Sequence, residues 1–145
     1  MKSYVEKMNT FLANQIVFYI KLHNLHWYIQ GHGFFTLHAQ YEKLYDEATE
    51  VLDEVAERLL QMDQQPVSTL KSALALADIE ERASGAVDGK ESIEILLKDY
   101  EKLAEDAQEI VTLSAEAGDD GTADQFTAYL RSYAKIVWML KAYQK

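Results

Sequence analysis

The sequence predicts an all-α protein in which four long helices form a bundle, with one long connection between the second and the third helix. Its 145 residues include a single proline, Pro66, and six glycines that fall in three close pairs. The stretches between these breaks are rich in Leu, Ala, Glu, Lys and Gln, which favour helices. No Asn-Gly or Asp-Gly pair lies between two alternating strand patterns, so the sequence predicts no β-hairpins.

The first two predicted helices cover residues 3–29 and 34–62, with the glycine pair at 31 and 33 between them. In both, apolar residues recur every three or four positions, which is the period of a helix with one buried face. The first stripe consists of Val5, Met8, Leu12, Ile16, Tyr19 or Ile20, and His23. The second consists of Leu37, Tyr41, Leu44, Ala48, Val51 or Leu52, Val55 and Leu59.

A long connection follows, in which the segment STLKSALAL after Pro66 predicts a short helix of its own. The third long helix begins at a capping box formed by Asp88 and Glu91 and ends before Gly118. Its apolar stripe consists of Ile93, Leu96, Tyr100, Leu103, Ala107, Ile110 and Ser114. A second capping box, Thr122 with Gln125, is predicted to open the fourth helix, whose stripe is Phe126, Leu130, Tyr133, Val137 and Leu140.

The charge balance is acidic, with 24 Asp and Glu against 14 Lys and Arg and a net charge of −10. Such a surface repels phosphate backbones and attracts cations. The chain has no cysteine, so its metal ligands cannot be thiolates. The longest apolar run, residues 16–20, is too short for a membrane span, and we expect a cytoplasmic protein with no membrane contact.

All four histidines lie between residues 23 and 38. If His38 is placed at 0° on the second helix, Glu42 falls at about 40°, Asp53 at about 60° and Glu57 at about 100°, on one flank. Imidazole and carboxylate together are a ligand set for iron, zinc or manganese. The alternative is that Asp53 and Glu57 belong to an exposed face, with Arg58 as their local partner.

A distance argument separates these residues into two groups. At the helical rise per residue, His38 and Asp53 are about 22 Å apart and cannot share a metal ion. His26 folds back toward His38 if the glycine turn forms a hairpin, and it then lies about 25 Å or more from Asp53. A two-fold dimer with antiparallel pairs of helices would set the imidazoles of one chain against the carboxylates of the other. Any metal site is therefore predicted to lie between two subunits.

Residues 25–60, LHWYIQGHGFFTLHAQYEKLYDEATEVLDEVAERLL, closely resemble the signature of the Dps family, the miniferritins or DNA-binding proteins from starved cells. The shared order is His-Trp, Gly, Phe-x-x-Leu-His and Asp-x-x-Ala-Glu-Arg, and the helix layout agrees over nearly the whole chain. The resemblance implies a ferritin-like four-helix bundle with a short extra helix in the crossover. It also implies a hollow homo-oligomer, a dodecamer of two-fold dimers, that oxidises Fe(II), typically with hydrogen peroxide, and stores Fe(III) mineral.

The resemblance also assigns residues. Iron, as one or two Fe per site, would be bound by His26 and His38 of one chain with Asp53 and Glu57 of its partner. Many relatives have an aspartate where this chain has Glu42, so Glu42 is either a direct ligand or acts through a bound water.

Three neighbouring aromatic residues each have two interpretations. Trp27 is either a buried aromatic or, as the family suggests, an electron donor to the metal. His23 is expected to pack or to donate a hydrogen bond rather than to bind metal, and His32 to lie at the surface or near the ligands.

The segment EAGDDGTAD resembles the family loop that lines acidic three-fold pores, through which Fe(II) enters. Asp120 and Asp124 match pore positions and Asp119 lies beside them. Ala115 stands where some relatives have another aspartate, so the pore is expected to differ. The alternative is that these acids cap the fourth helix, with Asp124 as one of the capping residues.

Direct DNA binding is not expected. Relatives that bind DNA usually do so through tails rich in Lys or Arg, whereas this chain has a short N-terminus and ends in KAYQK directly after the fourth helix. Two other classes remain as alternatives: a nucleoid-associated structural protein without important redox activity, and a helical assembly module whose histidines only pack. A gel shift at low and moderate salt tests the first of these alternatives.

Overall fold

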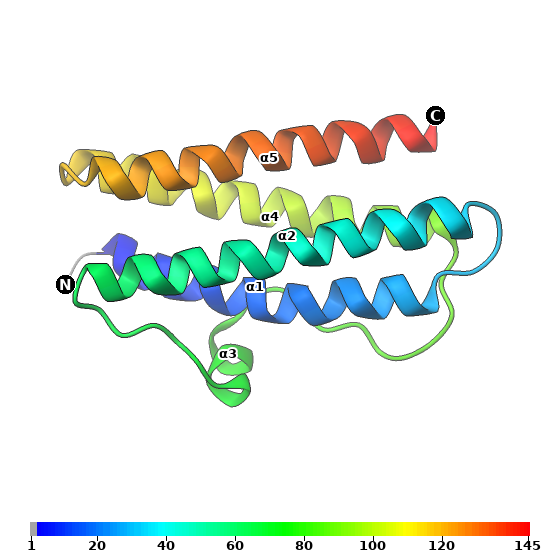
Figure 1. The fold of residues 1–145 in the computed structure, drawn as a ribbon, viewed down its shortest axis with the longest axis horizontal. Helices are drawn as coiled ribbons and strands as arrows, with labels where there is room; N and C mark the ends of the chain where they lie inside the picture. The colour runs from blue at the N-terminus through cyan, green and yellow to red at the C-terminus, as the bar shows by residue number, and fades with distance from the viewer. Residues whose placement is uncertain (1–2) are drawn as a thin grey trace.

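The computed structural model describes residues 3–145, which form two antiparallel helical hairpins packed face to face (Figure 1). One hairpin pairs α1 with α2 and the other pairs α4 with α5, while α3 lies in the long crossover beside α1. The helices are α1 (Ser3–Tyr28), α2 (Phe34–Gln61), α3 (Leu70–Leu76), α4 (Gly89–Glu116) and α5 (Asp120–Gln144). The predicted bundle with a short extra helix in its crossover is thus confirmed. None of the described helices is long and apolar enough to cross a membrane.

The helix ends follow local backbone chemistry, with one correction to the prediction. Gly33 lies in the left-handed region at φ 86°, where glycine is favoured, and α2 begins directly after it. At the start of α4 the side chain of Asp88 accepts a hydrogen bond from the Glu91 N–H, as predicted. The predicted cap at Thr122 is wrong: α5 begins earlier because Asp119 accepts a hydrogen bond from the Thr122 N–H.

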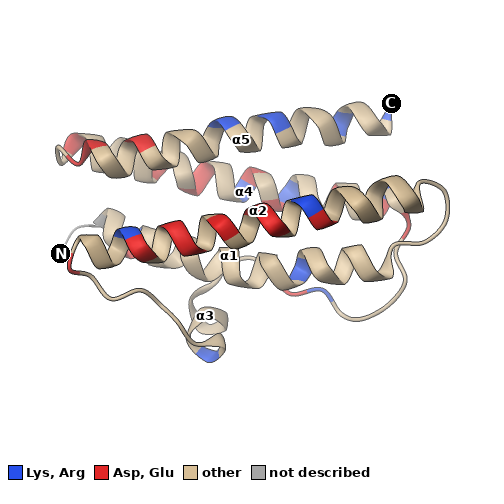
Figure 2. Cartoon of the chain, viewed as in Figure 1, with Lys and Arg blue, Asp and Glu red and all other residues tan. Residues whose placement is uncertain are grey.

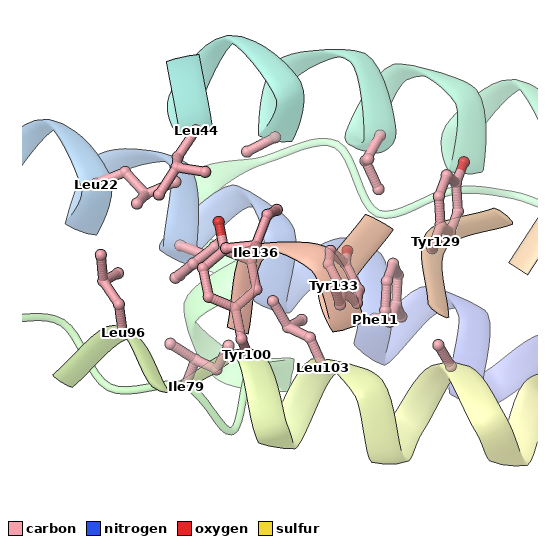
Figure 3. Close-up of a cluster of buried hydrophobic side chains, with 14 of the residues drawn as sticks. Phe11, Leu22, Leu44, Ile79, Leu96, Tyr100, Leu103, Tyr129, Tyr133 and Ile136 are labelled. Atoms are coloured by element: carbon pink, nitrogen blue, oxygen red, sulfur yellow. The ribbon is translucent and has the colours of Figure 1, made fainter. Parts of the chain in front are cut away.

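The core lies between the two hairpins (Figure 3). The predicted stripes of α2 and α4 are buried, and Val51 rather than Leu52 points inward. On α5, Tyr129 and Ile136 are buried although they were not predicted, whereas Leu130 and Val137 are only half-buried. The buried face of α5 therefore contains Phe126, Tyr133 and Leu140 of the predicted stripe together with Tyr129 and Ile136 beside them.

The buried face of α1 also differs from its prediction. Ile16, Tyr19 and His23 are only half-buried, while the side chains of Phe18 and Leu22 are almost fully buried. The reason is that α1 packs against α2, α3 and α4, so its buried arc is wider than the single stripe expected of a bundle helix.

The irregular crossover is fixed to α1 by buried amides. Asn14 Oδ1 accepts hydrogen bonds from the N–H groups of Asp78 at 2.7 Å and Ile79 at 3.0 Å. Farther along, Arg82 Nη1 donates to Asn24 Oδ1 at 2.8 Å. These contacts hold the crossover along the length of α1 and satisfy backbone groups that form no helix.

An ion pair joins α1 to α4 inside the bundle. Lys21 Nζ lies 2.8 Å from Asp99 Oδ2, and both side chains are only 9% exposed. Burial raises the pKa of Asp99 above its usual value, although the positive charge of Lys21 opposes that shift. Each charge of the pair therefore offsets the cost of burying the other in a largely apolar interior.

Candidate metal centre

The two predicted histidine ligands are joined by a reciprocal pair of hydrogen bonds. His26 Nδ1 lies 2.6 Å from the His38 carbonyl oxygen, and His38 Nδ1 lies 2.8 Å from the His26 carbonyl oxygen. A carbonyl oxygen only accepts, so each Nδ1 carries its hydrogen and donates it. In a neutral ring this tautomer places the lone pair on Nε2, which is the nitrogen that can then bind a metal ion.

The two imidazole rings are also held by packing. Their centroids are 3.7 Å apart and their planes are tilted by only 15°. The ring of Phe34 stacks on His38 at 5.0 Å, and the ring of Tyr45 meets His26 edge-on at 5.3 Å. His26 is buried, with 6% of its surface exposed. The ends of α1 and α2 that flank the glycine turn therefore hold two imidazole rings in fixed orientations.

The predicted carboxylates lie far along the same helix. Because α2 is unbroken from Phe34 to Gln61, the rise per residue places Asp53 about 22 Å from His38. Figure 2 shows acidic residues along much of α2, and both Asp53 and Glu57 are exposed. Within residues 3–145, no three His, Asp or Glu side chains come close enough together to hold a metal ion. One chain thus carries two separated groups of ligand-type residues.

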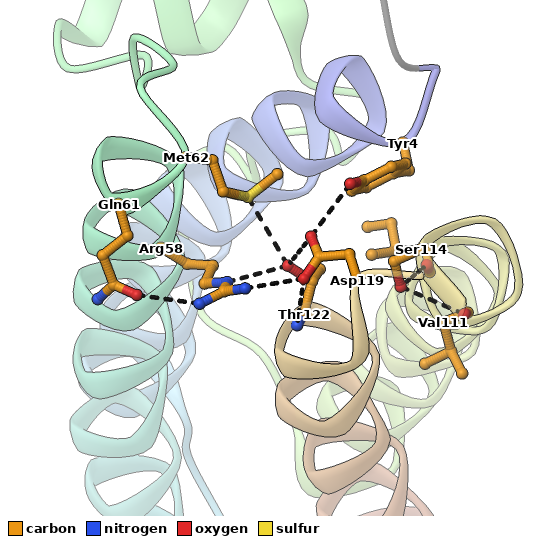
Figure 4. A network of polar contacts seen from close by, with 9 residues as sticks. Tyr4, Arg58, Gln61, Met62, Val111, Ser114, Asp119 and Thr122 are labelled. Carbon is orange, nitrogen blue, oxygen red and sulfur yellow. Dashed lines mark hydrogen bonds and ion pairs between the residues drawn. The ribbon is translucent and has the colours of Figure 1, made fainter. Parts of the chain in front are cut away.

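Arg58 is not the partner of these carboxylates. Its Nη2 lies 2.8 Å from Asp119 Oδ1, and its Nε donates to Thr122 Oγ1 at 3.0 Å (Figure 4). Among the described residues, neither Asp53 nor Glu57 forms an ion pair. The interpretation that made Arg58 their local partner is therefore wrong, and both carboxylates are free to meet a cation or another chain.

The residues around the histidine pair have distinct environments. His23 donates from Nδ1 to the Tyr19 carbonyl oxygen at 3.0 Å and packs against aromatic rings, the role expected of it. Trp27 is 65% exposed, so the interpretation as a buried aromatic is wrong for the single chain. Glu42 and His32 are both exposed, with Glu42 one turn after His38 on α2.

The acidic loop before α5 contains one structural aspartate and two exposed ones. Asp119 Oδ1 accepts from Arg58 and the Thr122 N–H, while Oδ2 accepts from the Tyr4 hydroxyl at 3.0 Å and Thr122 Oγ1 at 2.7 Å (Figure 4). Asp120 and Asp124 are exposed at the start of the helix. The capping residue is therefore Asp119, where Asp124 had been expected to contribute.

Replacing Asp119 tests this cap. Burial alone would raise the pKa of Asp119, but hydrogen bonds from Thr122, Arg58 and Tyr4 outweigh it and hold the pKa below the ordinary 3.8. We expect Asp119→Ala to lower the free energy of unfolding at neutral pH by about 1–2 kcal/mol. Because the folded-state pKa is lowered, the charge-dependent stabilisation is complete above the ordinary pKa and is lost as pH falls through the lowered one. Urea unfolding at a series of pH values measures this.

Asp119→Asn is the matched control, since asparagine can also cap a helix but carries no charge. We expect Asn to recover part of the loss at neutral pH and to show a flatter acid limb than the wild type. An unchanged pH profile in Asp119→Asn would contradict the assigned role of the charge.

The chain is similar to known proteins over nearly its whole length. The ferritin-like domain family matches residues 5–145. General stress protein 20U of Bacillus subtilis is 38% identical over 139 residues, which cover 96% of this chain and 95% of that protein. The DNA protection during starvation protein of Listeria innocua is 40% identical over 139 residues, covering 95% of this chain and 89% of that protein.

A solved structure is similar over the same extent. The Dps protein of Vibrio cholerae O1 is described as a member of a broad superfamily of ferritin-like diiron-carboxylate proteins. It matches with a TM-score of 0.94 and 36% identity, covering 98% of this chain and 89% of that one. The family match over residues 5–145, the identity to these relatives and the shared fold agree. The chain therefore belongs to the Dps family of ferritin-like proteins.

Proposed function

We propose that this protein binds Fe(II), oxidises it with hydrogen peroxide and stores the resulting Fe(III) as a mineral, so that it protects against oxidative stress. The observation that carries this proposal is the pair His26 and His38, in which a hydrogen bond from Nδ1 holds each ring and leaves Nε2 as the nitrogen available to a metal ion. Support also comes from the diiron-carboxylate description of the Vibrio cholerae relative.

The proposed site lies between two chains. His26 and His38 of one chain face Asp53 and Glu57 of a two-fold partner, because the helical rise keeps these pairs about 22 Å or more apart within a chain. Neutral imidazoles and carboxylates suit iron, and the carboxylates balance its charge as Fe(III) forms. Glu42 is proposed either as a further ligand or as the residue that holds a ligand water.

The electron balance fits paired irons as substrates. One hydrogen peroxide takes two electrons and two protons and becomes two waters, and two Fe(II) ions supply those electrons as they become Fe(III). The protein contributes by holding the irons and by fixing each imidazole, through its Nδ1–H, in the tautomer whose Nε2 can bind metal.

The proposed assembly is a hollow dodecamer built from two-fold dimers. Fe(II) would enter by the acidic loops, where Asp120 and Asp124 are exposed and Asp119 fixes the start of α5. The acidic residues along α2 give the chain a surface that attracts cations (Figure 2). With a net charge of −10, direct DNA binding is not part of this proposal.

Anaerobic protein mixed with Fe(II) and then with hydrogen peroxide tests the proposal. We expect Fe(III) to form faster than in buffer, with two Fe(II) consumed per peroxide, and the iron to elute with the protein in gel filtration. Iron that is oxidised at the buffer rate, or that precipitates apart from the protein, would count against the assignment.

A further inference from the structure

Tyr45 lies between the histidine pair and a second group of aromatic rings. It follows His38 by two helical turns on α2, and the helical period places the two on the same face, within about 20°. Its ring meets the ring of His26 edge-on, with centroids 5.3 Å apart and an angle of 88°. Tyr45 is therefore in direct ring contact with a proposed iron ligand.

Tyr45 also contacts His23. The two rings stack with centroids 3.7 Å apart and an angle of 18°. His23 in turn lies 5.1 Å from the ring of Trp27, which is 65% exposed. Among residues 3–145, the ring of Trp27 pairs with His23 and with neither of the two ligand histidines. The series of contacts therefore runs from His26 through Tyr45 and His23 to Trp27.

We propose that Tyr45 is the first protein group to give an electron to the iron site, ahead of Trp27. The proposal rests on the function proposed above and concerns a site that holds a single Fe(II). Such an iron supplies one of the two electrons that hydrogen peroxide requires. The second comes from Tyr45, whose ring contacts the His26 ring directly, whereas Trp27, although next to His26 in the chain, makes its ring contact with His23.

The reaction balances with these groups alone. The O–O bond of hydrogen peroxide breaks as Fe(II) becomes Fe(III) and the Tyr45 phenol becomes a neutral tyrosyl radical. The phenol O–H bond supplies one proton and solvent supplies another, which completes two waters. Without this donor, one-electron reduction of peroxide by a single iron would release a hydroxyl radical. The expected benefit of Tyr45 is thus protection when iron is scarce at the site.

Freeze-quench electron paramagnetic resonance tests the proposal in the full assembled protein, loaded with less than one Fe(II) per site and mixed with hydrogen peroxide. We expect a tyrosyl radical in the wild type that is lost in Tyr45→Phe, a variant that keeps the ring and removes the hydroxyl. A spin trap added in parallel should report more hydroxyl radical from Tyr45→Phe than from the wild type.

Two further variants serve as controls. Trp27→Phe should keep the tyrosyl signal, and so should Tyr19→Phe, whose ring lies 6.3 Å from Tyr45. A wild type that oxidises iron without a tyrosyl radical, or a signal that survives in Tyr45→Phe, would overturn the role of Tyr45. Failure of the proposed function looks different, because iron and peroxide would then react no faster with the wild type than in buffer at any loading. Tyr45→Phe should still oxidise paired irons, which shows that its site has formed.

Discussion

A His26→Gly, His38→Gly double variant is expected to oxidise Fe(II) with hydrogen peroxide about 100-fold more slowly than the wild type, because both imidazoles are removed from every proposed site. Stopped-flow absorbance of Fe(III) at equal protein concentration measures the rate. His32→Gly is the matched control, because His32 is exposed in the same turn and should be dispensable. Equal rates in the double variant and the wild type would eliminate the proposed site and favour histidines that only pack.

Mixing two inactive variants tests the division of the site between chains. An Asp53→Asn, Glu57→Gln variant should be as inactive as the histidine variant. If the two are unfolded together and refolded as an equal mixture, half of the dimers combine both chains, and each mixed dimer has one site with all four ligands. We expect about a quarter of the wild-type rate to return. A site contained in one chain predicts no recovery.

The largest expected effect on stability is at the buried ion pair. Lys21→Met should lower the free energy of unfolding at neutral pH by about 3–5 kcal/mol, because it leaves Asp99 charged and unpartnered in the interior. Chemical denaturation with circular dichroism measures the loss. Adding Asp99→Asn to Lys21→Met removes the uncompensated charge and should restore much of the stability.

The same pair predicts a pH dependence. Burial raises the folded-state pKa of Asp99 above the ordinary 3.8, so the folded protein holds this proton more tightly than the unfolded chain. Stability linked to Asp99 therefore rises as pH falls through the raised pKa. Without Lys21 the pKa of Asp99 rises further, and the cost of Lys21→Met should shrink toward acidic pH. A cost that is independent of pH would mean that Asp99 is not the group responsible.

The sequence predicted the buried faces of α2 and α4 better than those of α1 and α5. Both α2 and α4 bury a single periodic stripe, for which amphipathic spacing is a sufficient signal. On α1, spacing alone could not choose between the stripe through Ile16 and the one through Phe18, since both are apolar. That choice depends on α3 and the crossover, which pack against α1 from a distance in sequence.

In the candidate site, too, only some features could be predicted from the sequence. The separation of His38 from Asp53 could be calculated from the sequence because the rise per residue of a helix is constant. The orientation of the imidazoles could not, since it depends on hydrogen bonds between two helices. Tyr45 was missed as a neighbour of the site, although its spacing of seven residues from His38 was a usable signal. The contact of Asp119 with Arg58 could not be predicted from the sequence, because it joins two segments 61 residues apart.

The reciprocal hydrogen bonds between His26 and His38 also bear on timing. They join residues of one hairpin, whose close spacing along the chain lets them form early in folding. The carboxylates of the proposed site, by contrast, arrive only with a second subunit. A newly made chain would thus carry an oriented but incomplete site, and iron oxidation would begin only after assembly. The order of folding would then keep this chemistry away from isolated subunits, which have no enclosed space to hold its product.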